Sequence, residues 1–175
     1  MGFDLYGENP VMRFIDDDKY PIYDKYVNMD WDEQRKIFSG DSMLEKEYYE
    51  EWRLRDKENP GTYFRSNVWW WRRLWSYTAY HCKDILTEED IEHGSYNDNH
   101  LISEEKASAI AKRLQEKIDD GDAKVYEDEL KLAMEQAEKD ENGQPKDFDM
   151  MYPFAVSVVQ EFITFCSESG GFRIG

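Results

Sequence analysis

The residues best suited to chemistry lie in one segment, from residue 59 to residue 83, which holds no Asp or Glu. Acids make up 39 of the 175 residues, so a stretch of this length without them stands out. Guanidinium groups bind phosphate through a fork of N–H donors, and aromatic rings stack on planar ligands. The segment holds both kinds: Arg65, Arg72, Arg73, Tyr63, Phe64, Trp69, Trp70, Trp71, Trp75, Tyr77 and Tyr80.

A helix over residues 67–83 would divide these side chains between two faces. At about 100° per residue, Val68 shares a broad apolar face with Trp71, Leu74, Trp75, Thr78 and Cys82. Such a face predicts a central, buried helix. The remaining narrow face carries Trp69, Arg72, Arg73, Ser76 and Tyr80.

Two interpretations of the narrow face are open. In the first, it forms a binding site for a small anion such as a nucleotide, in which arginines hold phosphate and rings stack. The candidate ligand-binding residues are then Arg65, Trp69, Arg72, Arg73 and Tyr80. In the second, Arg72 and Arg73 pair with nearby carboxylates across a helix interface and have a structural role.

The formal net charge of −17 excludes some classes of partner. A field of this sign repels nucleic-acid phosphates and anionic lipid surfaces, so we expect neither direct duplex binding nor membrane binding. The charge either keeps the protein dispersed or mimics a nucleic acid. In the second case the acidic helices expected at 41–57 and 123–139 would block a basic host protein.

No catalytic motif is present: the chain lacks GxGxxG, GxxxxGK[ST] and GxSxG. His81 and Cys82 would diverge by about 100° on a helix and make no natural dyad. The His and Cys residues lack the spacing of zinc ligands, and residues 96–100 lack the Gly and Glu of a calcium loop. We therefore expect a binding protein without metal or cofactor, and keep an unrecognised enzyme as the lesser alternative.

Composition places the chain among folded single domains. Hydrophobic residues make up 40% and aromatic residues 15%, too much apolar surface for a disordered chain. Cys82 and Cys166 are interpreted as reduced and buried. The first residues lack the features of a secretory signal, and no apolar run is long enough to span a bilayer, so a cytoplasmic location is expected. The oligomeric state is open, with a homo-oligomer compatible with so many aromatic residues.

Periodicity and capping signals predict a mainly α fold over residues 1–175, with 10–60 as its least regular part. Residues 3–6 and 172–174 alternate like strands and predict a small two-stranded sheet formed by the two ends of the chain. Six helices are expected, at residues 30–38, 41–57, 67–83, 103–119, 123–139 and 153–167. Pro153 is placed in the first turn of the last helix.

Several motifs together resemble a family of uncharacterised bacteriophage and prophage proteins. They are GFDLYG at 2–7, GTYFRSNVWWWR at 61–72, GSYND at 94–98, YPF at 152–154 and SGGF at 169–172. The resemblance covers more than half of the chain and implies a host bacterial cytoplasm. It attaches no activity or catalytic residue. It favours an antagonist of host defence, because small acidic phage proteins without enzyme motifs often have that role.

The chain departs from this family in two places. Relatives commonly have another residue where Arg73 stands, which makes Arg73 a weaker candidate than Arg72. Some relatives carry a Cys-rich insertion before the last helix, whereas residues 140–147 contain no Cys here. A zinc role of that insertion is therefore not expected in this chain.

Overall fold

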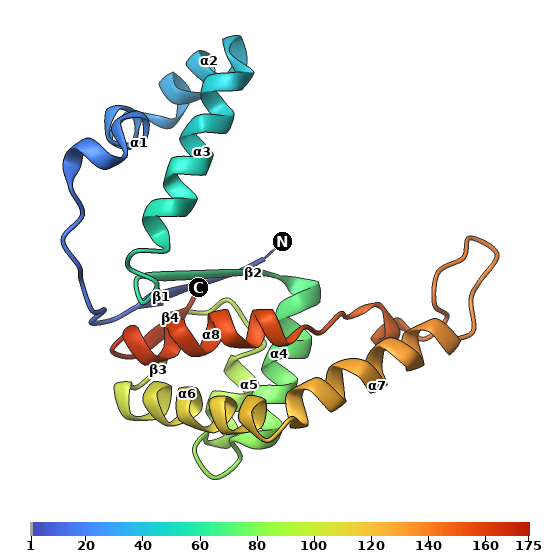
Figure 1. The fold of residues 1–175 in the computed structure, drawn as a ribbon. Helices are drawn as coiled ribbons and strands as arrows, with labels where there is room; N and C mark the ends of the chain where they lie inside the picture. Colours follow the sequence, from blue (N-terminus) through green and yellow to red (C-terminus); the bar gives the residue numbers. More distant parts are fainter. Residues whose placement is uncertain (1) are drawn as a thin grey trace. The chain divides into compact units, whose positions relative to one another are not determined.

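The computed structural model describes residues 2–175, which form two compact units. The main unit contains the residues up to 11 together with 61–175, and the helical unit contains 12–60. Eight α-helices among the described residues confirm the mainly α class (Figure 1). Two of them, α1 (Pro21–Tyr26) and α5 (Glu88–His93), were not predicted, because six residues are too few to show a helical period.

The sheet of the main unit has four antiparallel strands in the order β2-β1-β4-β3. The predicted pairing of the chain ends is confirmed, with Leu5 opposite Ile174. The two-stranded prediction was nevertheless wrong. The strands are β1 (Gly2–Gly7), β2 (Tyr63–Asn67), β3 (His100–Ile102) and β4 (Phe172–Ile174). Strand β2 was not predicted, because it lies in the aromatic-rich segment that was assigned to the central helix and its approach. Strand β3 was not predicted, because three residues are too few to show an alternating pattern.

Four long helices complete the main unit (Figure 1). They are α4 (Val68–His81), α6 (Glu104–Asp119), α7 (Asp122–Gln136) and α8 (Val156–Glu168). Helix α6 packs along α8, and α4 contacts both α6 and strand β1. The side chain of Asn67 caps α4 by accepting hydrogen bonds from the backbone N–H groups of Trp69 and Trp70, and Ser103 caps α6.

The last helix begins at Val156, so the prediction that Pro153 lies in its first turn was wrong. Residues 152–155 are non-helical because the ring of Phe154 is buried against two tyrosines. Its centroid lies 4.8 Å from those of Tyr77 and Tyr126. This packing extends the segment across the end of α4.

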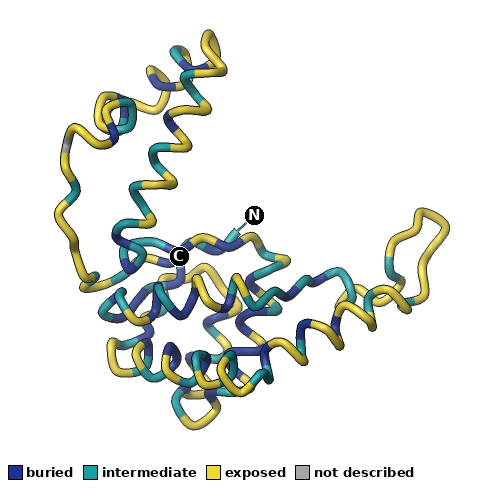
Figure 2. Tube along the Cα trace, viewed as in Figure 1, coloured by how far each residue is buried: buried dark blue, intermediate teal, exposed yellow. Residues whose placement is uncertain are grey.

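The broad apolar face of α4 is buried as predicted (Figure 2). Trp71, Leu74, Trp75, Thr78 and Cys82 are each at most 3% exposed. The ring of Trp71 stacks on Phe3 and on Trp75, with centroids 5.4 Å apart in both pairs. Cys82 and Cys166 are buried and unbridged, and burial raises the pKa of the Cys82 thiol to about 12. Both thiols are therefore poor nucleophiles at neutral pH.

One polar atom of this core has no hydrogen-bond partner among the described residues, the hydroxyl oxygen of Thr78. Burying an unpaired hydroxyl costs free energy, so Thr78→Val is expected to stabilise the protein by about 1 kcal/mol. Urea unfolding of the two proteins measures this difference. Thr78→Ser keeps the hydroxyl and loses a methyl group, so it should destabilise instead. A destabilised Val variant would show that the hydroxyl has a partner in solution.

The helical unit contains a short 3₁₀ turn (Asp17–Lys19), α1, α2 (Trp31–Gly40) and α3 (Ser42–Asp56). Asp30 and Asp41 cap α2 and α3, which confirms the two helices predicted in this region. Its small core consists of Tyr26, Phe38 and Tyr48. In the part of the chain that the structure describes, no helix combines the length and apolarity needed to cross a bilayer.

Candidate functional site

Arg72 and Arg73 line a cavity of about 440 Å³ on the main unit, which we call the arginine pocket. It lies between α4, the loop that follows α5, and the segment that precedes α8. Its lining residues are Trp71, Arg72, Arg73, Trp75, Ser76, Gly94, Ser95, Tyr96, Asp149 and Tyr152. A volume of this size is within the range of small-molecule sites.

Two buried tryptophans of α4 hold the loop side of the pocket in place. The indole N–H of Trp71 donates to the backbone oxygen of Gly94 at 2.7 Å, and that of Trp75 donates to Ile91 at 3.0 Å. Both bonds attach the end of α5 to the central helix. The following residues, Ser95 and Tyr96, are thereby placed at the pocket.

Arg73 anchors the opposite side of the pocket. Its guanidinium donates to the backbone oxygens of Tyr152, at 3.3 Å, and Asp149, and lies 3.5 Å from the hydroxyl of Tyr126. All three acceptors are neutral, so they satisfy N–H groups of Arg73 without cancelling its charge. These bonds tie the 3₁₀ turn at Phe148–Met151 to α4.

Arg72 is much less constrained. It is exposed, and its closest polar contact is a long one, 3.5 Å from Nη1 to the hydroxyl of Tyr152. Its guanidinium carbon lies 5.9 Å from the centre of the same ring. Among the side chains that the structure describes, neither Arg72 nor Arg73 forms an ion pair with a carboxylate, although the carboxylate-bearing Asp149 also lines the pocket. The pairing with carboxylates considered above is therefore not observed.

The five predicted binding residues do not form one cluster. Arg72 and Arg73 share the pocket, whereas Trp69 is not part of its lining and packs against Phe148 and Tyr152, with centroids 5.5 and 5.2 Å away. The other two lie outside the pocket lining. Arg65 is on β2, with Nε 3.6 Å from a carboxylate oxygen of Asp4, and exposed Tyr80 contacts His81 and Lys83.

The pocket also contains residues that were not predicted to bind. Tyr96 is the important one, because it is 53% exposed and is the ring of the lining most accessible to a ligand. Ser95 and Tyr152 are further additions. Their motifs, GSYND and YPF, had been noted, but one was interpreted only as a loop and the other as a helix start. The buried rings of Trp71 and Trp75 form the inner wall and leave little surface for stacking.

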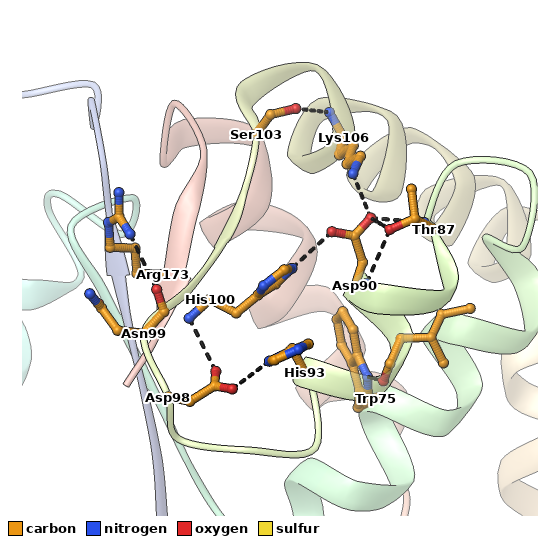
Figure 3. Close-up of polar contacts among 11 residues, drawn as sticks. Trp75, Thr87, Asp90, His93, Asp98, Asn99, His100, Ser103, Lys106 and Arg173 are labelled. Carbon is orange, nitrogen blue, oxygen red and sulfur yellow. Dashed lines mark hydrogen bonds and ion pairs between the residues drawn. The ribbon is translucent and has the colours of Figure 1, made fainter.

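Next to the loop lies a polar cluster centred on Asp90, whose side chain is 3% exposed (Figure 3). Its carboxylate accepts hydrogen bonds from the N–H and hydroxyl of Thr87, both at 2.8 Å, from His100 Nε2 at 2.9 Å and from Lys106. Burial acts to raise the pKa of Asp90, but the bonds from Lys106, His100 and Thr87 outweigh it and hold the pKa well below its usual range. The described residues contain no group of side chains arranged to bind a metal ion.

In comparisons with models of protein families, with curated proteins and with solved structures, the chain matches none of them. The resemblance to bacteriophage proteins therefore stays a prediction.

Proposed function

We propose that the protein is a non-enzymatic binding protein whose arginine pocket takes up a small anionic ligand of the nucleotide class. In the phage setting that the resemblance implies, it would act as an antagonist of host defence by sequestering such a ligand. One observation carries the proposal: two guanidinium groups line one pocket without a carboxylate partner among the described residues.

The charge of the chain makes this observation informative. With 39 acidic residues against 22 basic ones, an arginine has many possible acidic partners. Other arginines use them, since Arg113 binds Asp84 through two N–H groups at 2.8 Å and Arg173 binds Glu8 at 2.6 Å. No carboxylate among the described residues neutralises the positive charges of Arg72 and Arg73, so both charges are available to a ligand. A phosphate group matches the fork of donors that a guanidinium offers.

The remaining side chains suit a ligand with a planar part. Tyr96 offers an accessible ring on the loop side, and aromatic rings of this kind contribute about 1–3 kcal/mol when they stack on a base. Hydroxyl groups of Ser76 and Ser95 supply neutral donors and acceptors around it. The pocket is open to solvent on the side of Arg72, so a ligand can enter without a change in the core.

The first test identifies what the protein carries. The full chain is purified gently from bacteria with active nucleotide signalling, its ligand is released by heat, and mass spectrometry identifies the ligand. A nucleotide present in stoichiometric amount supports the proposal. An empty protein that also fails to bind adenosine monophosphate or inorganic phosphate in calorimetry contradicts it.

Arg72→Ala is expected to weaken binding of the identified nucleotide about ten- to a hundred-fold, the loss of one or two charge-assisted hydrogen bonds. Its unfolding midpoint should stay close to that of the wild type, because Arg72 makes only long contacts in the structure. Calorimetric titration and thermal unfolding measure the two quantities.

Two other arginines serve as controls for this result. Arg65→Ala removes an exposed arginine outside the pocket and should bind like the wild type. Arg73→Ala should lose both affinity and stability, because Arg73 anchors residues 149–152. If Arg65→Ala weakened binding as much as Arg72→Ala, the ligand would not be held in the arginine pocket.

A second candidate function is an acidic protein that blocks a basic host protein. It is favoured by α7, whose lysines are already engaged: Lys124 binds Glu127 and Asp128 at 2.8 and 2.7 Å, and Lys131 binds Glu127 at 3.2 Å. Exposed acids such as Glu129 and Glu135 are thus left without neutralising partners among the described residues. If the protein purified for ligand identification contained no nucleotide but co-purified with a basic host protein, that result would favour this function.

A further inference from the structure

The loop that supplies Tyr96 to the pocket is fastened at both ends. At its start, the indoles of Trp71 and Trp75 bind the end of α5. At its far end, the side chain of Asn97 donates to the Gly2 oxygen at 2.8 Å, and the backbone N–H of Asn99 donates to the Ile174 oxygen at 2.8 Å. Between these points Ser95 and Tyr96 are exposed and have only turn hydrogen bonds to the end of α5.

One side-chain contact closes this loop across its base. Nδ1 of His93, the last residue of α5, binds the carboxylate of Asp98, as Figure 3 shows. The same imidazole stacks on that of His100 in β3, with centroids 4.8 Å apart and an angle of 18° between the planes. His100 in turn binds the buried carboxylate of Asp90, which Lys106 also holds. The closing contact is therefore attached, through His100, to the buried carboxylate of Asp90.

We infer that His93 is a protonation-dependent latch on the arginine pocket, which holds the loop at residues 94–99 closed when its imidazole is charged and releases it when the imidazole is neutral. The inference concerns regulation of the proposed site. The latch itself is a property of the ligand-free chain and can be measured without a ligand.

The direction of the effect follows from the groups that face His93. Asp98 contacts it from the loop, Glu89 and Glu92 act on it from α5, and stacked His100 faces it from β3. Lys106 of α6 reaches the cluster only through Asp90. The hydrogen bond that His93 donates to the carboxylate of Asp98 raises the pKa of His93, because a charged imidazole is favoured beside a carboxylate. A raised pKa means that the closing ion pair is complete at low pH and is lost as pH rises through the folded-state value.

The pocket should respond through Tyr96. Its ring lies near that of His93, with centroids 6.2 Å apart at 79°, and its backbone N–H donates to the His93 oxygen at 2.9 Å. Loosening the pair between His93 and Asp98 therefore frees the stacking ring of the pocket, while Arg72 and Arg73 on α4 are unaffected. A ligand would then bind more weakly at alkaline pH.

Hydrogen exchange of the full ligand-free chain tests the latch. Protection factors of the amides of Ser95 and Tyr96, corrected for intrinsic exchange rates, are measured from pH about 5.5 to about 8.5, on either side of the usual pKa of histidine. They should fall about two- to five-fold in the wild type, the range expected for one partly exposed ion pair. His93→Gln and Asp98→Asn should remove this pH dependence.

His81→Gln is the matched control, since His81 is also paired with an aspartate, Asp122 at 3.1 Å, but away from the loop. This variant should retain the pH dependence of amide protection at Ser95 and Tyr96. A flat wild-type profile, or an unchanged slope in both His93→Gln and Asp98→Asn, would overturn the latch. Such a result leaves the proposed function standing, whereas failure of the ligand tests above leaves the latch standing.

Discussion

Replacing Gly94 with alanine is expected to destabilise the main unit by about 3 kcal/mol, at the upper end of the range for overpacking. A β-carbon at this position would overlap the indole ring of Trp75 at Cε2, Nε1 and Cζ2. The indole of Trp75 is held in position, because it is buried and stacked on Trp71. The indole or the loop must shift. A shift of the Trp75 indole breaks its bond to Ile91, and a shift of the loop breaks the bond from Trp71 to Gly94.

Denaturant unfolding followed by tryptophan fluorescence measures this loss, since four of the six tryptophans lie on α4. Gly40→Ala is the control. A β-carbon at Gly40 would meet nothing within 4 Å, and Gly40 ends a helix, where alanine is at least as favourable. The control should be unchanged or slightly more stable. A Gly94→Ala variant as stable as the wild type would show that the loop does not pack on Trp75.

Asp90→Ala is expected to cost about 3–5 kcal/mol of unfolding free energy, the usual loss when one partner of a buried ion pair is removed. The carboxylate is the common acceptor for Thr87, His100 and Lys106, which belong to three different elements. The substitution also removes the capping box at the start of α5, in which Thr87 and Asp90 bind each other's backbone N–H. Urea unfolding at neutral pH measures the change.

The carboxylate of Asp90 should also make the free energy of unfolding decrease at acidic pH. Its folded-state pKa lies below the usual value of about 4, so its contribution is present above that pH and is lost as pH falls toward the folded-state pKa. The stability difference between wild type and Asp90→Ala should therefore shrink from pH about 7 to pH about 3. Asp90→Asn, which keeps an acceptor oxygen but not the charge, should lose less than Asp90→Ala. An Ala variant whose deficit does not change with pH would contradict the ionised, paired state of Asp90.

Helix α4 shows which structural features the local sequence can predict. The apolar period of 3.6 residues predicted its buried face, and the polar residues Ser66 and Asn67 indicated where it begins; Asn67 is the cap. Both are local properties of the chain, set by backbone geometry and by a side chain that binds its own helix. The same reasoning placed Ser103 before α6 and the paired strands at the two chain ends.

Elements stabilised by distant partners could not be predicted in this way. Strand β3 has three residues and exists because it pairs with β4, and the non-helical segment at Pro153 exists because Phe154 packs on Tyr77 and Tyr126. Neither arrangement has a periodic signal within its own segment. Likewise, Tyr80 shares the narrow face of α4 with Arg72 but lies outside the pocket lining, because a helical face does not reveal which neighbour covers each turn.

By itself, the sequence determined the composition of the site: an acid-free, arginine- and tryptophan-rich helix in a chain of net charge −17, with one face that must be buried. Which of the two arginines is anchored depends on contacts made only in the folded chain. Two of the three acceptors of Arg73 are backbone oxygens 76 and 79 residues away, and Tyr96 reaches the pocket because two indoles bind the end of α5. Hydrogen bonds to backbone atoms leave no trace in residue types, so this division of roles appears only when the chain is folded.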